Sequence, residues 1–397
     1  MSNSLNRRNW IRSSAVMAGG LAFLTGTANK LVAAPVSRKS TKEPEFFDEN
    51  PFISEAEIAA ATPPELKARL NANENPFGPS PAAKKALQDA IDGSFRYPMR
   101  TQGALSDKIA AHEGLTAANI LLSSGSTPLL QAAALHFTKG GGKSIISGDL
   151  SYTDLPNAAR KYGANWVQVP MTPDFKLDLD AMEAKVDDTT ALIYICNPNN
   201  PTATLLDKDK LKSFCERVSK KTTIMIDEAY IDYLPNPEEV TLMGAVKAGQ
   251  NVIVARTFSK LYGFAGLRCG YFVGQPETLR AIGNYTTSNM ALSATTIAAA
   301  IAGYQETSFL QDALKKANAS KEYLYASLKK EGYDYIPSAA NFVLFPIKME
   351  GRKFSTEMSN RGVGIRTWSY KGKDYCRVSI GKMEEMEAFV DAFKQLS

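Results

Sequence analysis

Cysteine and histidine are scarce in this sequence of 397 residues, which contains four of the first and two of the second. The cysteines form no C-x-x-C pair, so the sequence indicates neither a zinc site nor a disulfide framework; they are Cys196, Cys215, Cys269 and Cys376. Two histidines also leave little for a histidine-based metal site. We therefore expect no metal centre.

Acidic residues are absent from the beginning of the chain, where none precedes Glu43. Residues 1–34 carry four positive charges, from Arg7, Arg8, Arg12 and Lys30. The formal net charge of the whole chain is +5, so the remainder is close to neutral. A near-neutral body gives no reason to expect nucleic acid or an anionic membrane as a partner.

Long apolar runs are also missing. The uncharged stretch from Ser13 to Asn29 is interrupted by three glycines, and it is too short and weakly apolar for a stable membrane span, which needs about 20 strongly apolar residues. It follows NRRNWIR (Asn6 to Arg12), which resembles a twin-arginine export signal. We expect residues 1–34 to be that signal and the protein to be periplasmic or otherwise extracytoplasmic. If the arginine pair is a coincidence, we expect a cytoplasmic protein.

Two nucleotide-binding motifs are missing as well. No G-x-G-x-x-G follows a strand-like run, which weakens a dinucleotide-binding interpretation. Gly140 to Ser144 ends like a P-loop, but Phe137 stands where that motif requires a glycine. We interpret the stretch as a loop before a strand.

Strand-like and helical patterns alternate through the body of the chain. The strand-like runs are Ile120 to Ser123, Ser144 to Ser147, Trp166 to Val169, Ala191 to Cys196, Thr223 to Ile226, Asn251 to Ala255 and Gly270 to Val273. Such alternation predicts an α/β fold with a mainly parallel sheet and helices on both faces.

The last hundred residues change character and predict a smaller α+β domain. A long helix is expected from Glu306 to Lys330, followed by strands at Ala340 to Phe345, Val363 to Arg366 and Tyr375 to Ile380, and a closing helix from Met383 to Leu396. We place a linker or N-terminal arm at 35–69, the N-terminal part of the small domain at 70–98, the large domain at 99–305 and the rest of the small domain at 306–397.

The stretch RTFSKLYGFAGLRCGY, from Arg256 to Tyr271, carries the main chemical signal. It places Lys260 in a Ser-Lys pair after the strand-like run Asn251 to Ala255. A lysine acts as a nucleophile when its surroundings lower its pKa or when an aldehyde cofactor traps it as an imine. Arg256 and Arg268 nearby suggest that such a cofactor is anionic, which indicates pyridoxal phosphate. A Ser-Lys pair alone is more typical of an ordinary surface lysine, and the other motifs of the chain decide against that interpretation.

Other motifs supply groups that this cofactor requires. Asp227 follows a strand, where a carboxylate can pair with a protonated pyridine nitrogen or simply cap a helix. Asn200, in CNPNNPT, can donate an amide hydrogen to a ring oxygen or belong to an ordinary Asn-Pro loop. Ser126 and Thr127 at a helix start can hold a phosphate or act as an ordinary cap. Tyr152 can stack on a flat ring or pack in the core.

Taken in order, these motifs resemble the class I/II pyridoxal-phosphate aminotransferases, most closely the histidinol-phosphate aminotransferase family. The resemblance runs from about Leu70 to the C-terminus. It rests on NENPFGPS (Asn73 to Ser80), Arg96-Tyr97-Pro98, Gly125-Ser126, Tyr152, CNPNNPT (Cys196 to Thr202), DEAY (Asp227 to Tyr230), the stretch around Lys260, and CRVSIG (Cys376 to Gly381). It implies the fold type I architecture of pyridoxal-phosphate-dependent transferases.

The resemblance also implies roles for single residues. Lys260 would hold the cofactor as an imine and then move a proton between substrate and cofactor carbons. Asp227 would pair with the ring nitrogen, Tyr230 and Asn200 would bond the ring oxygen, and Tyr152 would stack on the ring. The phosphate would be held by Ser126, Thr127, Thr257, Ser259 and Arg268, with Tyr97 reaching across from a second subunit of a homodimer.

Substrate contacts follow in the same way. Arg377 would take the substrate carboxylate or its equivalent through a bidentate fork, Asn73 would lie in the arm over the substrate, and Arg366 would touch a distal anionic group. Two positions depart from the family pattern: Thr127-Pro128 replaces an acidic pair, and Ala203 replaces a glycine. Neither change removes a catalytic group.

We therefore expect an aminotransferase that moves an amino group between an amino acid or a histidinol-phosphate-like amino-alcohol phosphate and a 2-oxo acid such as 2-oxoglutarate. Three alternatives remain. They are a pyridoxal-phosphate lyase or decarboxylase acting on a phosphorylated amino acid, a cofactor-binding regulator, and a non-catalytic α/β binding protein. Such regulators carry a DNA-binding helix-turn-helix, and residues 1–69 show no such pattern.

Overall fold

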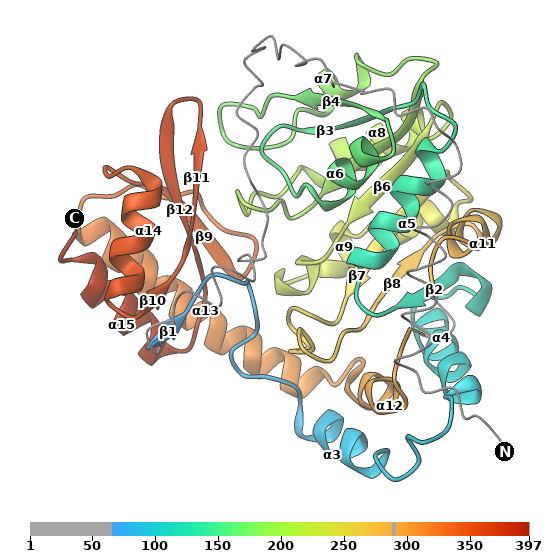
Figure 1. The fold of residues 1–397 in the computed structure, drawn as a ribbon, viewed down its shortest axis with the longest axis horizontal. Helices are drawn as coiled ribbons and strands as arrows, with labels where there is room; N and C mark the ends of the chain where they lie inside the picture. Colours follow the sequence, from blue (N-terminus) through green and yellow to red (C-terminus); the bar gives the residue numbers. More distant parts are fainter. Residues whose placement is uncertain (1–65, 288–290, 397) are drawn as a thin grey trace, which may run out of the picture. The chain divides into compact units, whose positions relative to one another are not determined.

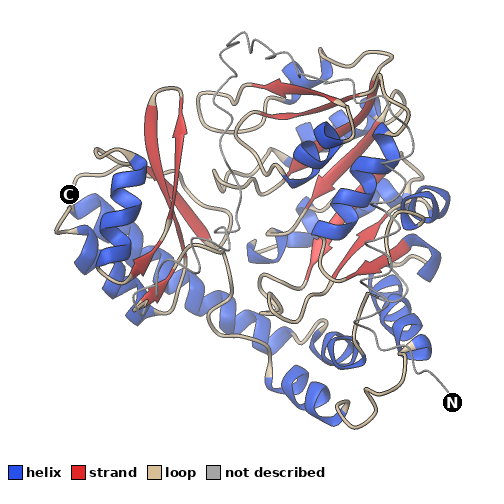
Figure 2. Ribbon diagram, in the orientation of Figure 1, coloured by secondary structure: helices blue, strands red, loops and turns tan. Residues whose placement is uncertain are grey.

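The computed structural model describes residues 66–287 and 291–396. The predicted export signal and nearly all of the predicted linker lie outside the described residues. Within the described part, a large sheet with its helices is followed by a smaller assembly of strands and helices near the C-terminus (Figure 1, Figure 2).

Seven strands form the large sheet in the order β2-β8-β7-β6-β5-β3-β4. All neighbouring pairs are parallel except those that involve β8, which runs antiparallel to both β2 and β7. The bounds are β2 Ile120–Ser123, β3 Ser144–Gly148, β4 Asn165–Val169, β5 Thr190–Cys196, β6 Thr223–Asp227, β7 Val252–Thr257 and β8 Gly270–Val273. The mainly parallel sheet predicted from the sequence is confirmed.

Alternate residues of these strands enter two different hydrophobic cores. Ile224 and Ile226 of β6 belong to one core, whereas Met225 between them belongs to the other. Side chains on a strand point to opposite faces in turn, so both faces of the sheet are buried, as parallel sheets require.

Helices cover both faces and connect the strands. Local sequence signals set their ends: Asp207 caps α8 through its side chain, and Ser80 caps α3, whose first residue is Pro81. The helices before the C-terminal assembly are α3 Pro81–Asp89, α4 Met99–Glu113, α5 Thr127–Thr138, α6 Asp154–Lys161, α7 Leu179–Glu183, α8 Lys208–Val218, α9 Pro237–Val240, α10 Met243–Lys247, α11 Pro276–Gly283 and α12 Ala294–Gly303, with short 3-10 helices η1 Ala117–Asn119 and η2 Ile231–Tyr233.

The C-terminal assembly is built on an antiparallel sheet of order β11-β12-β9, beside which β1 and β10 pair in parallel. Its bounds are β1 Ala68–Arg69, α13 Thr307–Lys330, β9 Phe342–Pro346, α14 Gly351–Asn360, β10 Val363–Gly364, β11 Arg366–Tyr370, β12 Lys373–Ser379 and α15 Met383–Phe393. Its core joins Ala68 and Leu70 to residues between Ala313 and Phe393. The domain boundaries at 98/99 and 305/306 stay predictions.

The prediction of one strand from Val363 to Arg366 was wrong. The chain forms β10 and β11 with different partners on either side of Ile365. The hairpin that follows turns at Lys371 and Gly372, which have φ angles of 49° and 75°. Two consecutive positive φ angles are typical of the tightest hairpin turns, and Lys-Gly is a weak sequence signal for them.

Candidate active site

The expected cofactor residues gather at one edge of the large sheet. Cys196 and Asp227 pair at the carboxyl ends of β5 and β6, while Thr257 ends β7 opposite Gly270, where the antiparallel β8 begins. Ser123, which ends β2, pairs with the same Gly270. Ligands of open α/β sheets bind beyond this edge, so the topology brings the loops from β2, β5, β6 and β7 to a common site.

Lys260 lies in the loop after β7 and is partly buried. Its Nζ atom is 5.4 Å from the centre of the Tyr230 ring. Burial lowers the pKa of Lys260 to about 8, and the positive charges of Arg377 and Arg268 act in the same direction, against Glu74 and Asp227. An appreciable share of the amine is therefore neutral near pH 7 to 8, as a nucleophile requires.

Asp227 is almost fully buried, with 3% of its surface exposed. Its Oδ2 accepts a hydrogen bond of 2.7 Å from the hydroxyl of Tyr194, and its Oδ1 accepts one of 3.1 Å from the backbone N–H of Ala229. Burial raises the pKa of Asp227 to about 6, although both hydrogen bonds and the charge of Lys260 oppose that rise. A cationic partner beside this buried carboxylate would favour its ionised form.

The start of α5 and the loop before β8 form a narrow cradle. A Cβ atom on Gly125 would lie 2.4 Å from Nη2 of Arg268, and a Cβ on Gly270 would lie 2.5 Å from the backbone nitrogen of Ser126. Nη1 of Arg268 donates to Ser259 Oγ at 3.4 Å. Arg268 has a φ of 60°, an uncommon backbone conformation that clusters at functional sites.

Asp154 joins this cradle and was not predicted. The hydroxyl of Tyr152 donates to its Oδ2, and the hydroxyl of Thr127 donates to the same oxygen at 3.4 Å. Thr127 stands at a position where the family usually has an acidic residue. Here the carboxylate comes from Asp154 on α6, which accepts from the Thr127 hydroxyl. No short motif signals this contact, because the two residues are 27 positions apart.

Arg377, on β12, is buried, with 3% of its surface exposed. Its Nη1 donates to Oδ1 of Asn200 at 2.6 Å and its Nη2 donates to the backbone oxygen of Asn71 at 3.0 Å. Its guanidinium carbon lies 4.7 Å from the ring centre of Trp368 and 5.3 Å from that of Phe342. Neither aromatic residue was predicted to belong to the site.

Arg366 lies directly opposite Arg377 on the neighbouring strand β11. Cross-strand partners point to the same face of a sheet, with Cβ atoms about 5 Å apart. Two cationic side chains therefore share one face of the C-terminal sheet beside the site.

Asn73 brings the segment after β1 into the site. Its side-chain amide donates to the hydroxyl of Tyr230 at 3.1 Å, and its Oδ1 accepts from Ser379 Oγ at 2.8 Å. The φ of Asn73 is 53°, which asparagine adopts more readily than most residues. Its backbone oxygen accepts from Nδ2 of Asn341 at 3.1 Å.

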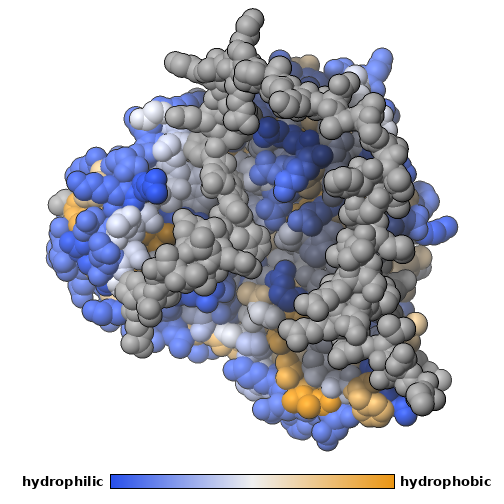
Figure 3. Space-filling view, in the orientation of Figure 1, coloured by the Kyte–Doolittle hydropathy of each residue, from blue (hydrophilic) through white to orange (hydrophobic). Residues whose placement is uncertain are grey.

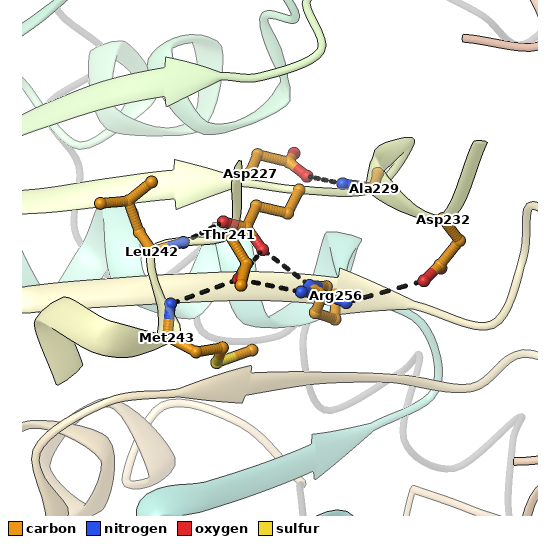
Figure 4. A network of polar contacts seen from close by, with 8 residues as sticks. Asp227, Ala229, Asp232, Thr241, Leu242, Met243 and Arg256 are labelled. Carbon is orange, nitrogen blue, oxygen red and sulfur yellow. Dashed lines mark hydrogen bonds and ion pairs between the residues drawn. The ribbon is translucent and has the colours of Figure 1, made fainter. Parts of the chain in front are cut away.

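Arg256 does not face the cofactor site, which corrects its interpretation as a signal for an anionic cofactor. Its Nε donates to Glu228 at 2.8 Å and its Nη1 lies 3.7 Å from Asp232. Glu228 also accepts from the backbone N–H of Leu242 at 2.7 Å. Figure 4 shows this network on the opposite side of the strand ends from Asp227. Arg256 follows the alternation of β7 and points away from Thr257.

Tyr97 lies far more exposed than the other expected cofactor residues, at 75% of its surface. Ile91, Phe95 and Met99 around it are also exposed, at 53%, 78% and 67%. Figure 3 shows apolar surface gathered at the lower edge of the view, in the region of α3. Within the described residues, the structure brings Tyr97 into no contact with the cradle.

These residues fit pyridoxal phosphate. The Gly125–Arg268 cradle admits no side chain and presents a helix start and a guanidinium, which suit a phosphate. Lys260 supplies an amine with a lowered pKa and Asp227 a buried carboxylate. In residues 66–287 and 291–396, no cluster of histidine, cysteine, aspartate or glutamate is suited to a metal ion. No helix among these residues combines the length and apolarity of a membrane span.

The profile of the family described as "Aminotransferase class I and II" matches residues 66–393. The chain belongs to this family. The histidinol-phosphate aminotransferase of Moorella thermoacetica is 34% identical to our aminotransferase over 330 residues, 83% of this chain and 85% of that protein. The aromatic amino acid aminotransferase of Mycolicibacterium vanbaalenii is 37% identical over 322 residues, 81% and 90% of the two chains.

A solved structure extends the comparison. The histidinol-phosphate aminotransferase of Sinorhizobium meliloti, in complex with pyridoxal 5'-phosphate, aligns with this aminotransferase at a TM-score of 0.77 and 25% identity, covering 90% of this chain and 100% of the other. The protein is therefore a pyridoxal-phosphate-dependent aminotransferase, and the fold class, enzyme class and cofactor predicted from the sequence are confirmed.

Proposed function

We propose that this aminotransferase takes its amino group from a donor whose amine lies close to an anionic group, either the carboxylate of an amino acid or the phosphate of a histidinol-phosphate-like amino alcohol. The amino group passes to a 2-oxo acid such as 2-oxoglutarate. One observation carries the proposal: Arg366 and Arg377 lie opposite each other on one sheet face, and the charge of Arg377 acts on Lys260. Two guanidinium groups together favour anionic substrates.

The chain's own residues take distinct parts in this reaction. Pyridoxal phosphate, when bound, supplies an aldehyde for the amino group and a ring that withdraws electrons from the reacting carbon. Lys260 Nζ would hold the cofactor and would carry the proton of the reacting carbon, for which a pKa of about 8 is suited. Asp227 stabilises a proton on the ring nitrogen.

Further contacts orient the ring. Tyr230 lies beside Lys260, and Asn200 uses its Oδ1 for Arg377, so we assign the Nδ2 amide of Asn200 and the Tyr230 hydroxyl to the ring oxygen. Tyr152 would lie against the ring face. Ser126, Thr127, Thr257, Ser259 and Arg268 would hold the phosphate.

Arg377 is already oriented for a substrate carboxylate or its equivalent. Asn200, the Asn71 backbone and two aromatic rings hold its guanidinium in place, so little side-chain entropy is lost on binding. Asn73 would close over the substrate from the segment after β1, and Arg366 would take the distal anion. Trp368 adds an aromatic wall that suits a donor with a flat ring.

The relatives named above as histidinol-phosphate and aromatic amino acid aminotransferases define the donors to test. The purified, cofactor-loaded enzyme is given histidinol phosphate, unphosphorylated histidinol, phenylalanine or tyrosine, with 2-oxoglutarate, and glutamate is measured. We expect turnover with an anionic donor and much less with histidinol. Equal turnover of histidinol phosphate and histidinol would refute the anion requirement. Product formed without any 2-oxo acid would indicate the lyase alternative.

We also propose that the active enzyme is a homodimer in which Tyr97 reaches the phosphate cradle of the partner. The exposed apolar segment around Tyr97 supports this arrangement, because such patches mark interaction surfaces. Light scattering at micromolar concentration should give the dimer mass, and Tyr97→Ala should weaken cofactor binding. A monomer with full cofactor affinity would contradict the proposal.

For localisation, we propose export through the twin-arginine pathway directed by residues 1–34. This route carries folded proteins and so suits an enzyme that acquires its cofactor in the cytoplasm. Replacing Arg7 and Arg8 by lysine should retain the protein in the cytoplasm of a fractionated host. An unchanged distribution would count against the signal.

A further inference from the structure

Tyr194 lies within the large sheet rather than in any loop of the site. It belongs to β5, where its exposed fraction is 0%. Its neighbours are the apolar residues of the core that includes Met225 and Phe272. A buried tyrosine hydroxyl in such surroundings requires a hydrogen-bond partner, and that partner is Asp227 Oδ2 at 2.7 Å.

Strand register explains the contact. Cys196 pairs with Asp227, and Tyr194 pairs with Met225, so Tyr194 and Asp227 lie on the same face with an offset of two residues. Two residues of a strand cover about 6.6 Å, a distance that a tyrosine side chain bridges and a serine does not. Phenylalanine would fill the same space without the hydroxyl.

Both carboxylate oxygens of Asp227 already accept a hydrogen bond from the protein. Tyr194 takes a lone pair of Oδ2 and the N–H of Ala229 takes one of Oδ1. The plane of the carboxyl group is thereby set from two sides. The hydroxyl also opposes the effect of burial on the pKa of Asp227, as do Ala229 and Lys260, while Asp154 acts with burial.

We infer that Tyr194 is a positioning residue for the reaction: its hydroxyl holds the Asp227 carboxylate in the orientation and ionised state in which it pairs with the protonated ring nitrogen of the cofactor. The inference rests on the role of Asp227 proposed above. Tyr194 itself touches neither the substrate nor the reacting atoms.

The test uses Tyr194→Phe, with Tyr333→Phe as the matched control because Tyr333 is a buried tyrosine in the C-terminal core. The pKa of the Asp227 carboxyl is measured by carbon-13 NMR of labelled, cofactor-free protein. In the loaded enzyme, nitrogen-15 NMR of labelled cofactor reports protonation of the ring. We expect Tyr194→Phe to raise the carboxyl pKa by about one pH unit, tenfold in proton affinity, to lower ring protonation and to reduce kcat with little change in KM.

Two outcomes would overturn the inference: an unchanged carboxyl pKa and ring signal in folded Tyr194→Phe, or equal changes in Tyr333→Phe. If Tyr194→Phe does not fold, Tyr194→Trp, which retains a donor, serves as the second variant and must preserve ring protonation. In an Asp227→Asn background, Tyr194→Phe should cause little further loss of kcat; a full additive loss also counts against it. The carboxyl pKa is measured without substrate. An unchanged pKa in Tyr194→Phe would therefore refute the role of Tyr194, whereas a wild type without turnover would refute the proposed reaction.

Discussion

Replacing Asp227 by asparagine should shift the stability of the cofactor-free protein in favour of the variant as pH rises. Asparagine keeps an acceptor for Tyr194 and cannot ionise; it gives up the acceptor for the N–H of Ala229 at every pH, so that loss does not change with pH. Burial raises the pKa of Asp227 from 3.8 to about 6. A group whose pKa is raised on folding contributes stability that is fully present below its unfolded pKa and is lost as pH rises through its folded pKa. The two values differ by a little over two pH units, so the wild type loses about 3 kcal/mol.

About half of this loss has occurred at pH 5 and nearly all of it by pH 8. The free energy of unfolding of Asp227→Asn should therefore rise relative to the wild type by about 1.5 kcal/mol between these pH values. Denaturant unfolding of both apoproteins at equal concentration measures the difference, with the exposed Asp334 changed to asparagine as the control for one lost carboxylate. A difference that stays constant from pH 5 to pH 8, or that falls, would refute the reasoning.

Three further changes test other parts of the site. Gly125→Ala should weaken pyridoxal phosphate binding by at least about tenfold in an equilibrium titration, because its φ of 96° strains any side chain, at about 1–3 kcal/mol, and its Cβ would strike Arg268. Arg256→Met should lower the free energy of unfolding by about 3–5 kcal/mol, because it leaves the buried charge of Glu228 without its partner. Arg366→Gln should raise KM for a phosphorylated donor in steady-state assays and leave KM for its unphosphorylated counterpart unchanged.

Each change has a matched control. Gly249→Ala also has a positive φ, of 73°, but its Cβ would meet no atom within 4 Å, so equal loss of cofactor in both variants would discount the cradle. Lys85→Met breaks an exposed ion pair, worth about 0–1 kcal/mol; a similar value for Arg256→Met would contradict its structural role. Lys373→Gln removes an exposed charge near the turn of the same hairpin, and an equal effect on KM would remove Arg366 from the substrate site.

The sequence predicted the gathering of Lys260, Asp227 and Arg268 because each follows or precedes a strand, and strand ends meet at one edge of an α/β sheet. Tyr194 could not be found in this way. In an apolar run such as TALIYIC it looks like an ordinary strand residue, and only the register between β5 and β6 turns it toward Asp227. Asp154 was missed for a similar reason, since its contacts depend on how α6 packs beside α5.

Alternation along neighbouring strands also explains the error with Arg256. Asp227 shares its face with Met225 and Tyr194, whereas Glu228 and Arg256 follow the parity of Ile226 and Val254, which lie in the other core. At the strand ends, Asp227 and Glu228 are therefore buried on opposite faces of the sheet. On one face, an acid with a raised pKa is kept for the cofactor at a cost in stability. On the other, Glu228 has its full set of partners, Arg256, Thr241 and the N–H of Leu242, and secures the ends of β6 and β7. Asp227 ends β6 and Glu228 follows it directly. A change at position 228 should therefore destabilise the fold, whereas a change at position 227 should impair the chemistry and remove the pH-dependent cost in stability.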